Sequence, residues 1–579
     1  MNLLRRYAGK YLRLFICAIA FLSLEAGCDL MQPTVMSWVV DNGIGSRNLA
    51  LVLRYGGLML LITAVGAFAA VMRNFISSNV SQGFGADLRG DLYQKIHSLS
   101  FDQIDRFEPA TLITRLTNDV TQLQNFVNGM MRIFVKAPLM CIGAIIMAML
   151  INFRLSLIVL AVMPLIIVLI VFNTRLAFPF FRRLQGAIDR VNGVMREFLS
   201  GIRVVRAFNR SGFEQQRFNE ANAGLSDIQK SAMRTMAVFS PGIALAVNLG
   251  AAAVLWAGGY RVNGGSMRVG QVMAFANYMI QILSALMMIS SVFTNFVRAK
   301  ASTQRIDEVM RAQSSIVKPE SPVAPQCTEI AFEDVTFRYS GADEPALRSL
   351  SFRCGVGETV GVIGTTGSGK TSLVSLIPRF YDATQGTVRI GGTDIRLLDD
   401  TALREKVAVV PQKNTLFTGT IAENIRWGNP SATDEEVRRA AAAAQADEFI
   451  EDFPEGYGTV LGQGGVNLSG GQKQRISIAR ALVRRPEILI LDDCTSAVDV
   501  ITEAKIRQGL RQLQHSLICI IISQRIASVM AADRILVLSG GELMGAGSHA
   551  ELLQSCPIYR DIYESQYGRG DLPGAGGDR

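Results

Sequence analysis

Two adjacent carboxylates follow an apolar run in the C-terminal half of the chain. Residues 488–491 are Ile-Leu-Ile-Leu, and Asp492 and Asp493 come directly after them. Such a run is typical of a buried parallel strand, and an acid at the end of that strand commonly holds a metal ion beside a phosphate. We therefore expect Asp492 to bind a divalent cation. Whether Asp493 can act as a catalytic base is the question that the motif raises.

A glycine-rich loop earlier in the chain supplies the matching phosphate site. Residues 358–371 read ETVGVIGTTGSGKT, an apolar strand and then a phosphate-loop pattern. Glycines let backbone N–H groups converge on phosphate oxygens, and the following helix presents its positive end. Lys370 is expected to reach the terminal phosphates and the Thr371 hydroxyl to ligate Mg²⁺. The nucleotide-binding residues predicted here are Gly364, Thr365, Thr366, Gly367, Ser368, Gly369, Lys370, Thr371 and Ser372. A glycine-rich turn without a ligand is the alternative, and the preceding strand argues against it.

These residues need an α/β domain to position them. Strand-like and helix-like segments alternate from Thr328 onward, which predicts such a domain over residues 328–567. Residues 313–327 include three prolines and are predicted to be a linker. The Gly-rich residues 568–579 are predicted to be a disordered tail.

Residues 1–312 predict an all-α membrane domain. The chain is 49% hydrophobic and 18% charged, and the apolar excess lies in the first 300 residues. Six segments are long enough to cross a bilayer, which takes roughly 20 residues each. They lie near 14–40, 52–80, 127–151, 155–178, 236–260 and 271–297.

The basic residues set the predicted topology. The net charge is +9, but the basic residues cluster in stretches between the apolar segments, which argues against nucleic acid as a partner. The arginine-rich stretches near 81–126 and 179–235 are expected in the cytoplasm. We therefore predict a multi-pass protein of the plasma membrane, with both termini and the α/β domain on the cytoplasmic side.

The segment at 467–475, NLSGGQKQR, indicates a family. Leu468, Ser469, Gly470, Gly471 and Gln472 resemble the signature of ABC ATPases, which caps the triphosphate bound to the opposite subunit. A serine and glycine amides at a helix start are aimed at anionic oxygens. Six spans followed by one such ATPase resemble an ABC exporter half-transporter over nearly the whole chain. The resemblance implies a dimer that holds two ATP molecules between two nucleotide-binding domains.

The resemblance also implies roles for residues outside these motifs. Tyr339 resembles the aromatic residue that stacks on adenine, and Gln412 the glutamine that senses Mg²⁺. Gln412 joins Thr371 and Asp492 as the implied metal-binding residues. Ser496 and Asp499 match the D-loop that links the two sites. The segments near 108–119 and 207–216 resemble coupling helices, which rest on the ATPase domains.

Two catalytic positions depart from the family pattern. Hydrolytic members carry a glutamate base where this chain has Asp493. The side chain of aspartate is one methylene shorter, so its carboxylate lies roughly 1.5 Å farther from the attacking water. Misplacements of that order can cost on the order of 100-fold in rate. Gln524 stands where the family usually has a histidine that contacts the terminal phosphate, and glutamine cannot carry a proton.

The two departures suggest the degenerate half of a heterodimeric exporter of the bacterial multidrug type. The chain's own site would hold ATP for long periods, and its intact signature would complete a competent site on a partner half-transporter. Hydrolysis is then expected mainly at the partner's site. A homodimeric exporter that tolerates Asp493 and an ATP-gated regulatory membrane protein are the alternatives.

Polar residues inside the spans are candidates for the substrate cavity. Glu25 and Asp29 share one face of the first span and could attract a hydrophobic or cationic amphipathic substrate, such as a drug or lipid. A polar contact with a neighbouring helix is an equally weighted alternative. A stripe in the sixth span suggests a solvated wall. Its members are Asn277, Gln281, Ser284, Ser291 and Asn295, with Met288 filling the gap in the helical spacing.

Overall fold

The computed structural model describes residues 2–513 and 517–567, which form two compact units. The first unit holds the described residues of Met1–His97 and Ala110–Arg311, and the second those of Ser98–Pro109 and Ala312–Arg579. The predicted disordered tail, 568–579, lies outside the described residues.

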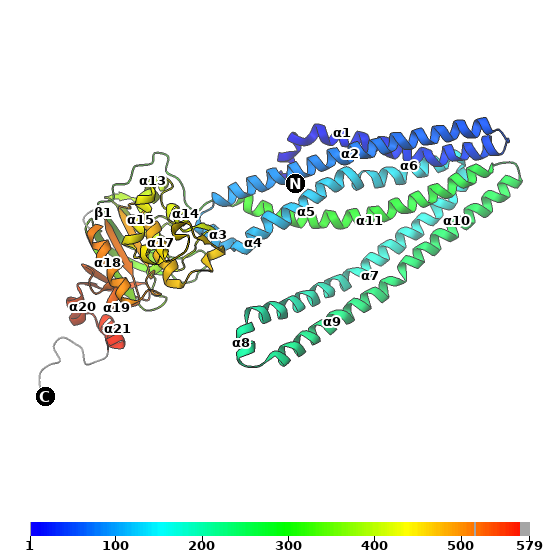
Figure 1. Cartoon of the computed structure of the whole chain (residues 1–579). Helices are drawn as coiled ribbons and strands as arrows, with labels where there is room; N and C mark the ends of the chain where they lie inside the picture. Colours follow the sequence, from blue (N-terminus) through cyan, green and yellow to red (C-terminus); the bar gives the residue numbers. More distant parts are fainter. Residues whose placement is uncertain (1, 514–516, 568–579) are drawn as a thin grey trace, which may run out of the picture. The chain divides into compact units, whose positions relative to one another are not determined.

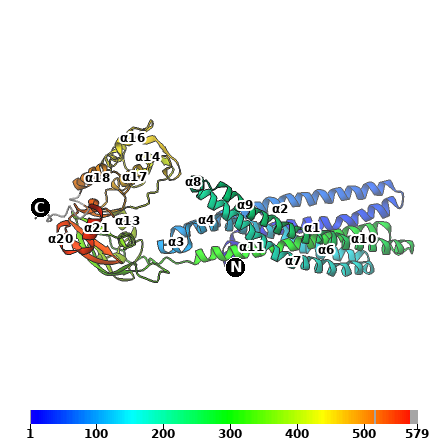
Figure 2. The same ribbon diagram turned by 90° about the horizontal axis from the view of Figure 1, so that it is seen from below.

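The first unit is all helical (Figure 1). Its helices are α1 (Asn2–Trp38), α2 (Leu49–His97), α4 (Pro109–Thr114), α5 (Val120–Gly129), α6 (Lys136–Ile151), α7 (Phe153–Ser200), α8 (Ile202–Ala207), α9 (Ser211–Ala237), α10 (Phe239–Asn263) and α11 (Val269–Arg311). Short π-helical turns at Val39–Ile44, Arg115–Asp119 and Met130–Phe134 interrupt them. The long helices α7 and α9 lie side by side and are joined through α8 (Figures 1 and 2).

Six stretches of the described residues are long and apolar enough to cross a membrane, which confirms the predicted all-α domain with six spans. They are Gly9–Ile44, Leu49–His97, Pro109–Ile151, Phe153–Asn173, Ser211–Asn263 and Val269–Ile289. Buried alanines such as Ala26 and Ala144 allow close helix packing. A buried tyrosine joins α11 to α1, because the Tyr278 hydroxyl donates to the Leu30 carbonyl at 2.6 Å.

The second unit is an α/β domain, as predicted. Its larger sheet has the order β12-β11-β3-β10-β9-β6, with only β12 antiparallel to its neighbour. These strands are β3 (Thr359–Gly364), β6 (Val407–Val410), β9 (Ile488–Asp492), β10 (Ile518–Ile522), β11 (Arg534–Ser539) and β12 (Glu542–Gly547). An antiparallel sheet contains β1 (Glu329–Phe337), β2 (Leu347–Gly355), β4 (Gln385–Ile390) and β5 (Thr393–Asp394). The short strands β7 (Gly419–Thr420) and β8 (Val460–Leu461) pair with each other.

The second unit also contains helices between and beyond its strands. They are α3 (Phe101–Phe107), α12 (Lys370–Leu376), α13 (Asp400–Lys406), α14 (Ile421–Arg426), α15 (Asp434–Ala443), α16 (Asp447–Glu451), α17 (Gly470–Leu482), α18 (Val500–Leu513), α19 (Ile526–Val529), α20 (His549–Ser555) and α21 (Pro557–Tyr567).

The strand register brings three functional loops to one edge of the sheet. Strand β10 lies between β3 and β9, and Ile522 is aligned with Val362 on one side and Asp492 on the other. Because these strands are parallel, the loops that follow them leave from the same edge, where ligands bind in open α/β sheets.

A segment from between two of the predicted membrane helices folds with the second unit, which is called the ATPase unit because it contains the predicted ATPase domain. Within Ser98–Pro109, the Phe101 ring packs on Phe380 at 4.7 Å between centroids, and Asp105 accepts a hydrogen bond of 2.6 Å from the Tyr381 hydroxyl. The segment that packs here therefore lies upstream of the coupling helix expected at 108–119. Residues 207–216 belong to the first unit.

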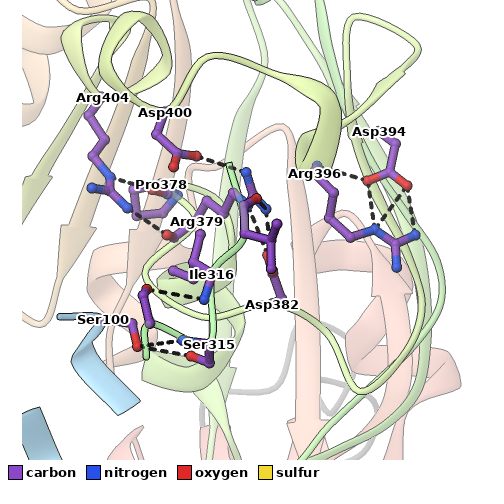
Figure 3. A network of polar contacts seen from close by, with 12 residues as sticks. Ser100, Ser315, Ile316, Pro378, Arg379, Asp382, Asp394, Arg396, Asp400 and Arg404 are labelled. Carbon is purple, nitrogen blue, oxygen red and sulfur yellow. Dashed lines mark hydrogen bonds and ion pairs between the residues drawn. The ribbon is translucent and has the colours of Figure 1, made fainter. Parts of the chain in front are cut away.

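Buried Arg379 fixes the start of the predicted linker on the ATPase unit (Figure 3). Its Nη2 donates to the Val317 carbonyl at 3.0 Å, its Nε to Asp382 at 2.9 Å and its Nη1 to Asp400 at 3.0 Å. Ser315, two residues before Val317, shares a 2.9 Å hydrogen bond with Ser100. This part of the linker is thus held by side chains, although it forms no helix or strand.

Candidate nucleotide-binding site

The phosphate loop connects β3 to α12 at the edge of the sheet. A Cβ on Gly364 would lie 2.1 Å from the Leu538 carbonyl oxygen, so no larger residue fits without a shift of the backbone. Gly369 has φ +94°, and a Cβ there would lie 2.6 Å from the Ala346 carbonyl oxygen. Both positions therefore require glycine, which is the physical reason for the pattern read from the sequence.

Lys370 lies folded against its own loop. Its Nζ donates to the carbonyls of Gly364 at 3.0 Å and Thr365 at 2.7 Å, and to the Ser368 hydroxyl at 3.3 Å. Burial lowers the pKa of Lys370, while the charges of Asp493 and Asp492 act in the opposite direction. An ammonium held among the backbone groups of a phosphate loop is well placed to bind an anion such as a phosphate.

Thr371 and Asp492, both predicted to bind the metal, contact each other. The Thr371 hydroxyl donates to Asp492 Oδ2 at 3.0 Å. Burial raises the pKa of Asp492, and the nearby charge of Asp493 adds to this effect. A hydroxyl and a carboxylate are oxygen ligands of the kind Mg²⁺ prefers, and a cation would relieve the repulsion between the two acids. The residues present therefore fit a magnesium ion.

Asp493 lies in the left-handed backbone region, with φ +46°. Its amide donates to the Ile522 carbonyl at 2.9 Å, and its Oδ2 accepts from Gln412 Nε2 at 3.2 Å. Burial raises the pKa of Asp493. The short side chain is thus already held by Gln412, the residue that the resemblance assigns to Mg²⁺.

A cavity of about 370 Å³ gathers these groups. It is lined by Tyr339, Ala346, Thr366, Gly367, Ser368, Gly369, Lys370, Thr371, Ser372, Gln412, Asp492, Asp493, Ile522 and Gln524. At one end, the Tyr339 hydroxyl shares a 2.9 Å hydrogen bond with Ser372, and its ring lies edge-on to Tyr381 at 5.3 Å. The carboxyl ends of β9 and β10, the segments that follow β3 and β6, and the connection between β1 and β2 therefore form one site.

The signature lies elsewhere on the unit. Ser469 caps α17 and accepts from the Gln472 amide at 3.3 Å, and Ser469 and Gly470 are exposed. None of the five signature residues, Leu468–Gln472, is among the residues that line the cavity above.

The D-loop packs against the signature helix. Gln474, in α17, donates to the Ser496 hydroxyl at 3.2 Å and accepts from the Ala497 amide at 3.0 Å. Asp499 Oδ1 accepts from the Thr502 amide at 2.9 Å, at the start of α18. The D-loop is thus tied to α17 by a buried side chain that the sequence analysis did not single out.

The two acids of the first span take part in an ion-pair cluster between helices. Glu25 is buried, and its Oε2 accepts from Arg73 Nε of α2 at 2.6 Å. Lys136, at the start of α6, lies 2.6 Å from Glu25 Oε1 and 3.0 Å from Asp29 Oδ2. Glu25 therefore makes the contact between neighbouring helices that was left open as the alternative. Basic residues inside the second and third predicted spans were the signal that could have indicated it.

The polar stripe of α11 is divided. Gln281 Nε2 donates to the Asp29 carbonyl at 3.3 Å, and thus faces α1. Asn277, Ser284 and Met288 lie on the exposed face of the helix. These three remain accessible, which the predicted role in a cavity wall requires.

Comparisons with known proteins agree on one family. Residues 15–286 match the family described as ABC transporter transmembrane region, and residues 347–496 the family described as ABC transporter. An uncharacterized ABC transporter ATP-binding protein of Bacillus subtilis, YfiB, is 40% identical over 95% of this chain and 96% of its own length. An ATP-dependent lipid A-core flippase of Syntrophus aciditrophicus is 31% identical over 98% of this chain and 94% of its own length.

A solved structure extends the likeness to the fold. The structure of a bacterial Atm1-family ABC exporter with ATP bound covers 96% of this chain and 99% of its own, with a TM-score of 0.80 and 26% identity.

Proposed function

This chain belongs to the ABC transporter family, and we propose that it is the degenerate half of a heterodimeric exporter. As an exporter half-transporter it is a multi-pass membrane protein with an ATPase coupled to transport. We propose in addition at which ATP site hydrolysis occurs, which kind of subunit is the partner, and which class of substrate is transported.

One observation carries the proposal: the two departures from the family pattern line the chain's own cavity, whereas the intact signature is exposed outside it. Asp493 and Gln524 both line the cavity that holds the phosphate loop. Ser469 and Gly470 are exposed at the start of α17, available to a nucleotide on another subunit. Substituted catalytic positions in the chain's own cavity and an intact signature outside it fit a chain that binds its own ATP and completes its partner's site.

The geometry of Asp493 supports slow hydrolysis at the chain's own site. A base must come within about 3 Å of the attacking water. The Asp493 carboxylate is shorter than glutamate and is engaged by Gln412 at 3.2 Å. Gln524, which also lines the cavity, has no titratable proton to exchange with the reacting phosphate.

Magnesium is the proposed metal. Thr371, Asp492 and Gln412 would hold it, and when bound with ATP it would neutralise charge on the phosphate oxygens. Lys370 would turn from its loop carbonyls toward the same phosphates, and Tyr339 would stack on the adenine ring.

We further propose that the substrate is an amphipathic drug or lipid, moved outward by alternating access. The likeness to a lipid A-core flippase over 98% of this chain supports a lipid. The ATPase unit and both termini would lie in the cytoplasm beneath a plasma membrane, since the arginine-rich stretches near 81–126 and 179–235 favour that side.

Co-purification tests the heterodimer. The tagged full chain is extracted from its native membrane, and the proteins that accompany it are identified and quantified. We expect a second half-transporter in equal amount, with glutamate and histidine at the positions of Asp493 and Gln524. Recovery of this chain alone would replace the heterodimer by the homodimeric exporter.

A second experiment tests the degenerate site. A photoreactive, radiolabelled ATP analogue is attached to this chain in the purified assembly, and its conversion to the diphosphate is followed. Conversion is expected to be about 100-fold faster in Asp493→Glu than in the natural chain, with Asp493→Asn as the slow control. A natural chain as fast as the glutamate variant would contradict the proposal. No hydrolysis in any assembly would favour an ATP-gated regulator.

A further inference from the structure

The last described helix, α21, reaches the loop that carries Gln524. This loop follows β10 and leads into α19. Gln566, near the end of α21, donates from Nε2 to the Gln524 carbonyl at 2.7 Å and accepts on Oε1 from the Ile526 amide at 2.8 Å. One side-chain amide therefore binds the backbone on both sides of Arg525, as a neighbouring strand would.

Helix α21 is a firm support for this contact. Tyr559 is fully buried and Tyr563 nearly so, and both belong to one apolar cluster with Ile526 and Val529 of α19. The Tyr559 hydroxyl also shares a 2.7 Å hydrogen bond with His549 of α20. Gln566 thus projects from an element whose position is set by its own core, even though its own side chain is exposed.

Other contacts hold the same loop at its remaining residues. The Ser523 amide donates to the Val362 carbonyl of β3 at 3.2 Å, and Arg525 Nη2 donates to the Ser496 carbonyl of the D-loop at 2.7 Å. These bonds fix the residues before and after Gln524. The bond from Gln566 fixes the carbonyl of Gln524 itself, so the backbone from which this cavity-lining side chain extends is held on both sides.

We infer that Gln566 is a positioning residue for the nucleotide site, which keeps the Gln524 amide directed at the terminal phosphate of bound ATP. The inference rests on the proposed role of Gln524 at that phosphate. Preorganised hydrogen-bond donors are effective because they need no rearrangement when the charge arrives. Helix α21, the last of the described helices, is therefore part of the ATP-sensing machinery rather than a peripheral addition to the fold.

Discrimination between ATP and ADP tests this role. The full chain is purified with whatever subunit accompanies it, and labelling of this chain by a photoreactive ATP analogue is competed with ATP or with ADP. Gln566→Leu removes both hydrogen bonds at similar size. We expect the affinity for ATP to fall about 3- to 10-fold, as for the loss of one or two hydrogen bonds, with ADP affinity changed less than about twofold. Gln554→Leu, on the exposed face of α20, is the matched control and should change neither affinity.

Two further variants separate the role of Gln566 from that of Gln524. Gln566→Glu keeps the acceptor for the Ile526 amide but places a carboxylate against the Gln524 carbonyl, so it should lower ATP affinity as Gln566→Leu does. Gln524→Ala should lower it too, and adding Gln566→Leu to Gln524→Ala should then have no further effect.

The failures are distinguishable. If Gln524→Ala weakens ATP but Gln566→Leu does not, or if Gln566→Leu weakens ATP and ADP equally, the positioning role is wrong and Gln524 keeps its proposed contact. If Gln524→Ala leaves the ratio of ATP to ADP affinity unchanged, the proposed contact of Gln524 fails and the role of Gln566 fails with it.

Discussion

Replacing buried Arg379 by lysine should destabilise the ATPase unit by several kcal/mol, although the charge is kept. Arg379 binds three acceptors that lie in different directions, the side chains of Asp382 and Asp400 and the carbonyl of Val317. A lysine ammonium is a compact group on a flexible stem and cannot span all three. Loss of two charge-assisted hydrogen bonds at about 1.5–3 kcal/mol each predicts a loss of about 3–6 kcal/mol in the free energy of unfolding. The backbone at this residue is left-handed, with φ +52°. Its strain is the same with either side chain and therefore does not change the difference in the free energy of unfolding.

The assay is thermal unfolding of the purified full chain in detergent. The transition that Mg-ATP shifts upward belongs to the ATPase unit, since a ligand stabilises the unit that binds it. For a domain of this size the melting temperature should fall by at least about 6 °C in Arg379→Lys. Arg396→Lys is the matched control, because Arg396 pairs with Asp394 while its side chain is 48% exposed (Figure 3). An exposed pair contributes less than about 1 kcal/mol. Equal shifts in the two variants would refute the reasoning.

Three further predictions follow from contacts in the nucleotide site and between the membrane helices. Thr371→Val removes the hydroxyl bound to Asp492, so ATP affinity should fall about 10-fold with Mg²⁺ and stay unchanged with EDTA, as measured by competition labelling. Burial raises the pKa of Asp492, so on acidification its carboxylate should be protonated, and Mg²⁺-dependent affinity should weaken, at a higher pH than for an ordinary aspartate. Asp493→Asn removes a like charge and should move that weakening to lower pH. Glu25→Gln leaves two basic side chains without their buried partner and should cost about 3–5 kcal/mol, seen as a lower melting temperature, whereas Asp29→Asn, at the more exposed end of the cluster, should cost much less.

The nucleotide site was largely predictable because its residues lie in short, continuous motifs. The phosphate loop follows its strand directly, and Asp492 ends another, so parallel strands alone bring Lys370, Thr371 and Asp492 to one edge. The membrane helices were predictable for a similar reason, since their signal is a local run of apolar residues. In both cases the sequence pattern and the structural element occupy the same stretch of chain.

Contacts between distant segments were not predictable in this way. Which face of α2 meets Glu25 depends on helix rotation, and apolar composition does not encode it. Gln566 and Gln524 are joined across the C-terminal helices by hydrogen bonds to the main chain, which leave no side-chain pattern. The docking of Ser98–Pro109 likewise depends on the shape of a surface made of Phe380 and Tyr381.

That docked segment limits how the ATPase can be produced as a fragment. A recombinant piece that begins at residue 312 would include Phe380 and Tyr381 but not Phe101 and Asp105, which cover them. Two aromatic rings would then face water, and a tyrosine hydroxyl would lose its acceptor. Such a fragment is expected to aggregate at the concentrations used for crystallography or NMR. Supplying residues 98–109 in trans as a peptide, or grafting them through a short linker, should restore its solubility.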